Sequence, residues 1–293
     1  MGRFLIRVPL AACAIGLCPS VVRAQEGTTT LSVEPTAVAS TPVSDSTYKP
    51  GDGEKSPWQA EFDAWIWLMG IHGDVGARGL VAKVQSTFVD VLDESDSIFA
   101  LSGRLELHYK RLGFFVDAFY ANIGKDDVSG PPDIGNIDVT MEQGIADFGV
   151  MYRVLERRPT GHAVNNLRDF SFDLYAGGRY SNVSLTLDPA LVGSREKSES
   201  WVDPIVGGKF IIPFAERWSA QINGDIGGFG AASELTFSAT GVLTYDFHIG
   251  SLPASVMAGY RAIGWDYQTG SDTNQFAWDV IAHGLIFGFG IRF

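Results

Sequence analysis

The sequence predicts an all-β fold, a transmembrane antiparallel up-and-down β-barrel, and three observations indicate it. Apolar and polar residues alternate with period two in segment after segment, as in strands with one apolar face. Several segments are longer than the roughly 9 to 11 residues that a tilted membrane-spanning strand needs, and far longer than strands of soluble sheets. The connections alternate between long polar stretches and tight turns, which is typical of membrane-spanning barrels.

Composition supports this fold and excludes two other classes of protein. Glycine accounts for 34 of 293 residues and aromatic residues for 12%, which suits many closely packed strands. Because 34 acidic residues outnumber 22 basic ones, the chain lacks the basic face that binding to nucleic acid requires. No window after Trp58 holds the 18 or so consecutive apolar residues of a membrane-spanning helix, so a helical membrane protein is excluded.

Residues 1–24 are predicted to be a secretory signal peptide. A basic start with Arg3 and Arg7 leads into an apolar stretch, and a small residue precedes the expected cleavage site before Gln25. Both cysteines, Cys13 and Cys18, lie in this segment, so the mature chain would have neither a disulfide nor a thiolate metal site. Lipoprotein cleavage at Cys13 is the alternative, although it would leave an apolar start to the mature chain.

Residues 25–57 are predicted to be a disordered N-terminal tail or linker. They are rich in Ser, Thr, Pro and Gly, and Tyr48 is their one aromatic residue. Such a segment buries too little apolar surface to offset the entropy of ordering it. Removing residues 1–24 takes away three arginines and no acid, so the mature net charge is 19 minus 34, or −15.

The barrel is assigned to residues 58–293, with ten strands. In the first of them Phe62 and Ile66 lie on one side, and Glu61 and Asp63 on the other. The predicted strands are about 58–69, 98–110, 113–123, 137–154, 169–183, 201–214, 217–228, 234–247, 254–265 and 277–293.

The predicted connections place long loops at one end of the barrel and short turns at the other. The long polar stretches are 70–97, 124–136 and 184–200, whereas 155–168 is a longer, arginine-bearing turn on the short side. Residues 79–94 fit either a helix or a short strand and are interpreted as an ordered part of the first loop. Eight or twelve strands remain alternatives, depending on 79–94 and 155–168.

The end of the chain carries a family resemblance. Leu285, Phe287, Phe289, Ile291 and the terminal Phe293 alternate with glycines and other residues. This segment resembles the C-terminal strand of bacterial outer-membrane β-barrel proteins, whose last aromatic residue is read by the barrel-assembly machinery. The resemblance covers roughly residues 58–293. It implies a location in the cell outer membrane, outer-membrane lipid and the assembly machinery as partners, and an assembly signal made of Phe287, Phe289, Ile291 and Phe293.

Two further segments are similar to strands of small OmpA-like and OmpW-like barrels, namely 201–208 (WVDPIVGG) and 224–230 (GDIGGFG). This likeness is to a class of proteins and names no substrate. Aromatic residues are also predicted to form two outward-facing belts at the membrane interfaces. The belt on the turn side contains Tyr109, Phe114, Tyr152, Phe170, Phe214, Trp218, Tyr245, Phe247 and Phe293, and the belt on the loop side contains Tyr120, Tyr180, Trp201, Trp265 and Tyr267.

The predicted lumen face is strongly charged, and this is the candidate functional feature of the chain. Because buried charges persist only when paired, the expected arrangement is a network of salt bridges that fills the interior of a narrow barrel. The function expected from it is non-enzymatic, with a structural or surface-interaction role. A narrow, cation-preferring pore for small solutes is the alternative. The predicted network is Glu61, Asp63, Arg104, Glu106, Asp117, Asp173, Arg179, Asp203, Lys209, Asp225, Arg261, Asp279 and Arg292, with Lys110, Asp147 and Arg153 on the same face.

A surface protease of the omptin kind is a remote alternative. Asp126-Asp127 and Asp246-Phe247-His248 have the spacing of the two catalytic pairs, but the predicted topology places them at opposite ends of the barrel. The histidines show no ligand-like spacing, and the acidic run 90–96 lacks a calcium-loop pattern, so no metal site is predicted. No catalytic or cofactor-binding motif is found, and no cofactor is expected.

Overall fold

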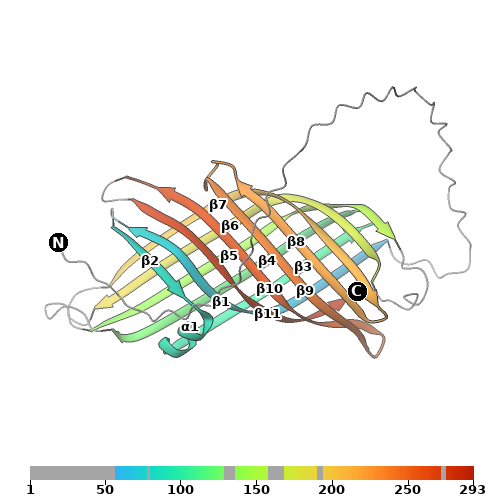
Figure 1. Cartoon of the computed structure of the whole chain (residues 1–293), viewed down its shortest axis with the longest axis horizontal. Helices are drawn as coiled ribbons and strands as arrows, with labels where there is room; N and C mark the ends of the chain where they lie inside the picture. Colours follow the sequence, from blue (N-terminus) through green and yellow to red (C-terminus); the bar gives the residue numbers. More distant parts are fainter. Residues whose placement is uncertain (1–56, 78–79, 129–135, 158–167, 190–193, 272–274) are drawn as a thin grey trace, which may run out of the picture. The chain divides into compact units, whose positions relative to one another are not determined.

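The strands of the computed structural model pair in chain order around a closed ring (Figure 1). The structure describes residues 57–293 except 78–79, 129–135, 158–167, 190–193 and 272–274. The predicted signal peptide 1–24 and all but the last residue of the predicted tail 25–57 lie outside the described residues. The elements are β1 (Trp58–Ala77), β2 (Leu80–Ser86), α1 (Phe88–Glu94), β3 (Ser97–Tyr109), β4 (Leu112–Val128), β5 (Ile137–Arg157), β6 (Phe170–Pro189), β7 (Arg195–Ala215), β8 (Trp218–Gly228), β9 (Leu235–Ile249), β10 (Leu252–Thr269) and β11 (Phe276–Arg292).

Closure of the ring comes from the pairing of the first strand with the last. β1 runs antiparallel to β11 from Glu61 opposite Arg292 to Ala77 opposite Phe276. Of the eleven described strands, β2 pairs only with β1 and stands outside the ring, so ten strands form the barrel. The predicted up-and-down barrel of ten strands is thus confirmed, and eight or twelve strands are excluded.

All ten predicted strands are present, but most extend further toward the loop end than predicted. The stretches 70–97, 124–136 and 184–200 were expected to be loops, whereas β1 continues to Ala77, β4 to Val128, and β6 and β7 together cover most of 184–200. Beyond the apolar band both faces of a strand can be polar, so alternation disappears from the sequence while the hydrogen-bonded ladder continues.

The sequence of residues 79–94 fits either a helix or a short strand, and the structure contains both. β2 forms a hairpin with β1, and α1 follows it as a helix of seven residues. A capping box starts α1: the backbone N–H of Thr87 donates to the Asp90 carboxylate at 2.8 Å, and the Asp90 N–H donates to the Thr87 hydroxyl. The Asp90 carboxylate also accepts from the Thr87 hydroxyl at 2.7 Å, and the two hydrogen bonds that it accepts from Thr87 hold the pKa of Asp90 below its usual value.

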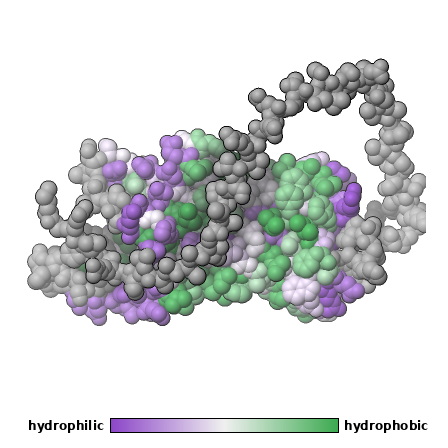
Figure 2. All heavy atoms as spheres, viewed as in Figure 1, coloured by the Kyte–Doolittle hydropathy of each residue, from purple (hydrophilic) through white to green (hydrophobic). Residues whose placement is uncertain are grey.

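The outer wall of the barrel is apolar around its middle. Outward-facing side chains such as Ile66, Leu101 and Ile226 are half or more exposed, and Figure 2 shows hydrophobic residues over the middle of the wall with hydrophilic ones toward both ends. Within the described part of the chain, no helix has the length and apolar character to cross a membrane.

Candidate functional site: a filled lumen

The lumen has two chemically different halves. In this description the turn end is the end with the tight turns 110–111, 216–217 and 250–251, and the loop end is the opposite one. Toward the turn end the interior is crowded with paired charges, and toward the loop end it is filled with apolar and aromatic side chains. The alternating pattern places both sets inside, because every second residue of each strand faces the lumen.

Arg179 is the centre of the first group of charges. Its side chain is fully buried, and it donates to both oxygens of Asp147 at 2.8 and 2.9 Å and to Asp225 at 3.0 Å. Its remaining nitrogen donates to the Thr236 hydroxyl at 3.0 Å. The Tyr175 hydroxyl donates to the second oxygen of Asp225 at 3.0 Å. One arginine from β6 therefore joins strands β5, β8 and β9 across the interior.

A second chain of alternating charges lies beside this group. Lys209 bonds Glu106 at 2.6 Å, and Glu106 also accepts from Arg104. Arg104 reaches Asp117 at 3.3 Å, and Arg261 bonds the other oxygen of Asp117 at 3.0 Å. Lys209 comes from β7 and Arg261 from β10, so the pairs connect opposite walls of the barrel. Each charge has an opposite charge as neighbour, which is the condition for keeping it buried.

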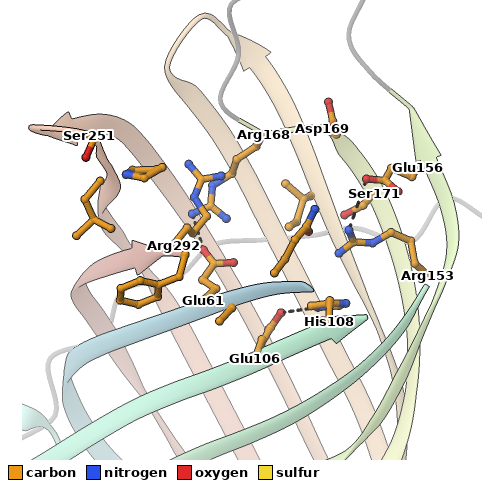
Figure 3. Close-up of a pocket in the computed structure, with 16 residues that line it drawn as sticks. Glu61, Glu106, His108, Arg153, Glu156, Arg168, Asp169, Ser171, Ser251 and Arg292 are labelled. Atoms are coloured by element: carbon orange, nitrogen blue, oxygen red, sulfur yellow. Dashed lines mark hydrogen bonds and ion pairs between the residues drawn. The ribbon is translucent and has the colours of Figure 1, made fainter. Parts of the chain in front are cut away.

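A cavity of about 560 Å³ opens at the turn end, and Figure 3 shows the side chains around it. Arg168 bridges Glu61 at 2.7 Å and Asp246 at 3.1 Å, and Arg292 approaches the same oxygen of Asp246 at 3.0 Å. Burial alone would lower the pKa of Arg168, but the carboxylates of Glu61 and Asp246 offset this effect, and its pKa is raised. At the side of the cavity Arg153 forms two hydrogen bonds to Asp173, at 2.9 and 3.2 Å.

Two buried acids have no basic partner among the described ion pairs. Asp203 accepts instead from the backbone and hydroxyl of Ser233, at 2.7 and 2.6 Å, and from the Trp201 indole. Asp63 lies 6% exposed beside a cavity of only about 20 Å³, and one of its oxygens has no hydrogen-bond partner in the described structure. This cavity has space for about one water molecule.

Aromatic residues fill the loop-end half of the lumen. Trp67 packs edge-on against Phe119 at 5.0 Å between ring centroids, and Trp201 stacks on Tyr267 at 4.0 Å. The Trp265 indole donates to the Ser181 hydroxyl at 3.0 Å. The buried members of this apolar cluster are Trp67, Met69, Ile71, Phe119, Ala121, Ile145, Val183, Trp201, Val242, Ile263, Trp265, Tyr267, Phe276, Trp278, Val280, Ala282 and Ile286.

The structure brings twelve of the thirteen predicted lumen residues to the inner face: Glu61, Asp63, Arg104, Glu106, Asp117, Asp173, Arg179, Asp203, Lys209, Asp225, Arg261 and Arg292. The placement of Asp279 was wrong, and so was that of Lys110, which lies exposed in the turn after β3. Asp279 is exposed and lies on the outer face, because it shares the parity of Leu285 and Phe287 in β11. It stands opposite Asp74 and Asp266 toward the loop end.

Three predicted belt residues were also wrong. Trp201, Trp265 and Tyr267 point into the lumen, with exposed fractions of 6%, 3% and 7%, and do not form an outer belt. The parity of Asp203 and Arg261, which share their strands, would have indicated the inner face. Tyr120 and Tyr180 do face outward.

Two interior charges were missed by sequence reasoning. Arg168 lies just before β6 and outside the described strands, so its position could not be predicted from alternation. Asp246 is fully buried in β9, whereas the sequence pattern indicates it only as part of a protease motif. Alternation in β9 gave a usable signal, because Asp246 shares the inner face with Val242 and Thr244.

The Asp126–Asp127 pair and the Asp246–His248 pair of the protease alternative lie at opposite ends of the barrel. Asp126 and Asp127 end β4 at the loop end, whereas Asp246 and His248 end β9 at the turn end. Asp246 is also fully engaged with arginines. No group of three or more potential metal ligands occurs among the residues whose placement is described.

Solved structures resemble this chain only distantly. The attachment invasion locus protein Ail of Yersinia pestis is 11% identical, with 80% of this chain and 98% of that chain covered and a TM-score of 0.32. The outer membrane protease OmpT of Escherichia coli is 9% identical, with 82% and 97% covered and a TM-score of 0.45. The translocator domain of autotransporter NalP from Neisseria meningitidis is 13% identical, with 83% and 90% covered and a TM-score of 0.28.

No protein-family model matches the chain, and no curated protein matches it. The likenesses above carry no activity to this protein, and its barrel fold is established by its own strand pairing.

Proposed function

We propose that this chain is a non-enzymatic outer-membrane β-barrel protein with an occluded lumen, which acts as a structural or surface-interaction protein rather than as a steady pore. The outward apolar band supports membrane insertion, because a soluble protein rarely exposes so much contiguous apolar surface. The turn end, where β1 starts and β11 ends, would then face the periplasm and the loop end the exterior.

The observation that carries the proposal is that side chains fill both halves of the lumen. Paired charges fill the turn-end half, and apolar and aromatic side chains fill the loop-end half. Ions crossing the turn-end half would have to separate buried pairs such as Arg179–Asp147, which leaves charges uncompensated. Ions crossing the loop-end half would have to pass an apolar cluster that offers few polar atoms. Either half alone opposes steady conduction.

Planar-bilayer recording of the purified full chain tests the occlusion. We expect little or no steady conductance, and we expect fractionation to recover the chain with outer membranes. A steady, cation-selective current that becomes more selective in Arg261→Ala would show a solvated path and would support the narrow pore instead. Recovery of the chain from the soluble periplasm would overturn the membrane assignment.

A further inference from the structure

The barrel wall has a gap between β1 and β3 in its loop-end half. The β1–β3 ladder ends at Trp65 opposite Ser102, and the next described partner of β1 on this side is β2, beginning with Ile71 opposite Ser86. Residues 66–70 of β1 have no described strand partner on this side, and residues 97–101 of β3 pair only with β4. We call these facing edges the β1–β3 notch.

The β3 edge of the notch is accessible on both faces. All five residues 97–101 are exposed, including Ile98 at 41% and Ala100, which share the parity of the lumen-facing Ser102. In a continuous wall such positions would be buried. On the outer face Phe99 and Leu101 are 59% and 67% exposed. The edge therefore presents both apolar side chains and backbone groups without a described partner.

The helix beside the notch adds apolar surface but does not cover the edge. α1 begins against β1, where a Cβ on Gly70 would lie 3.1 Å from the Cα of Thr87 and 3.4 Å from the backbone nitrogen of Phe88. None of its residues is buried, and Val89 and Leu92 are 61% and 50% exposed. In Figure 1, α1 lies beside β1 at the side of the barrel.

Acidic residues border the notch. The carboxylate of Asp96, next to the first residue of β3, accepts from the backbone N–H of Asp126 at 2.8 Å, which joins the α1–β3 connection to the end of β4. Lys125 offsets little of this charge, because it reaches Glu94 at only 3.9 Å. The acids gathered here are Asp90, Asp93, Glu94, Asp96, Asp126 and Asp127.

We propose that the β1–β3 notch binds an extended, basic polypeptide segment with alternating apolar side chains, which pairs with the free edge of β3 as an added strand. An added strand satisfies the backbone groups of residues 97–101 and places apolar side chains on Phe99 and Leu101, and its basic residues meet the acidic border. A lipid acyl chain supplies no hydrogen bonds to the edge, and the same acids repel anionic lipid headgroups.

Fluorescence anisotropy on the folded full chain in neutral detergent micelles tests this proposal. The probe is a labelled ten-residue peptide that alternates Lys with Val. One control peptide carries Glu in place of Lys, and the other keeps the lysines but has Pro in place of two Val residues, which removes backbone donors without changing the charge. We expect saturable binding of one Lys–Val peptide per barrel, and at least tenfold weaker binding of both controls.

Matched variants place the binding at the notch. Phe99→Lys should weaken binding of the Lys–Val peptide at least tenfold, whereas Phe229→Lys, which changes an equally exposed phenylalanine after β8, should not. Each variant must first show heat-modifiable migration equal to that of the wild-type barrel. Equal binding of the Pro-containing peptide would show attraction by charge alone and would overturn the proposal. Equal effects of Phe99→Lys and Phe229→Lys on binding would also overturn the proposal. Light scattering that shows a dimer in which the β3 edge is inaccessible to the peptide would overturn it as well.

Because binding is measured on the purified barrel, its failure leaves the occluded lumen and the membrane location untouched. Conversely, a conducting lumen would not remove the free edge of β3.

Discussion

Replacement of Arg179 by alanine tests the filled lumen most directly. The side chain is fully buried, and its removal leaves Asp147 and Asp225 without their arginine partner at the centre of the barrel. Breaking a buried ion pair from one side costs about 3–5 kcal/mol, because the remaining charge stays uncompensated. That cost corresponds to about two to four powers of ten in the unfolding constant.

The assay is equilibrium unfolding of the refolded barrel in detergent micelles, followed by tryptophan fluorescence and by heat-modifiable migration. Arg217→Ala is the matched control, because Arg217 is exposed and its one described side-chain hydrogen bond goes to the Tyr245 hydroxyl at 3.3 Å. An exposed contact of this kind contributes about 0–1 kcal/mol. The unfolding midpoint should fall clearly in Arg179→Ala and scarcely change in Arg217→Ala.

A compensated variant separates lost charge pairing from lost packing. Arg179→Met combined with Asp147→Asn and Asp225→Asn removes the whole charge group and should recover much of the lost stability, since no unpaired charge remains. If Arg179→Ala unfolded at the same denaturant concentration as Arg217→Ala, the lumen would be solvated and the reasoning about buried pairs would be refuted.

Three further predictions concern assembly and packing. Deletion of Phe293 removes the terminal aromatic residue and its two backbone hydrogen bonds to Ala60, so the heat-modifiable band in cells should decrease. Assembly of the deletion variant at the wild-type rate would contradict the assigned assembly signal. Trp67→Ala should lower the free energy of unfolding by about 3–5 kcal/mol, because it empties a buried position in the apolar cluster. A loss below about 1 kcal/mol in denaturant titration would show that the loop-end half of the lumen is loosely packed. Gly177→Ala should impair folding, because its Cβ would collide with the backbone carbonyl oxygen of Phe148. Gly241→Ala is the control, because open space surrounds Gly241 and the variant should fold normally. Equal refolding yields of the two variants would refute the close approach at Gly177.

The sequence by itself determined the strand content, the number of strands in the ring and most of the inner charged face. This was achievable because alternation with period two is a local property: once Glu61 and Asp63 are on one side, the rest of their strand follows. The same rule would have placed Trp201 inward, on the face of Asp203, and Asp279 outward, on the face of Phe287. The expectations of aromatic belts and of an acidic lumen led to the wrong faces, because they disagree with the alternation along these strands.

Only the tertiary structure decided which charges meet and where the wall opens. Arg179 bonds Asp225, which lies on a strand two places further along the chain. Arg168 reaches Glu61 and Asp246 from a position outside the described strands, which no local pattern describes. The gap between β1 and β3 likewise depends on two different strands, β2 and β3, that share the edge of β1. Pairing across a barrel depends on shear and on loop paths, which are properties of the closed ring and not of any one strand.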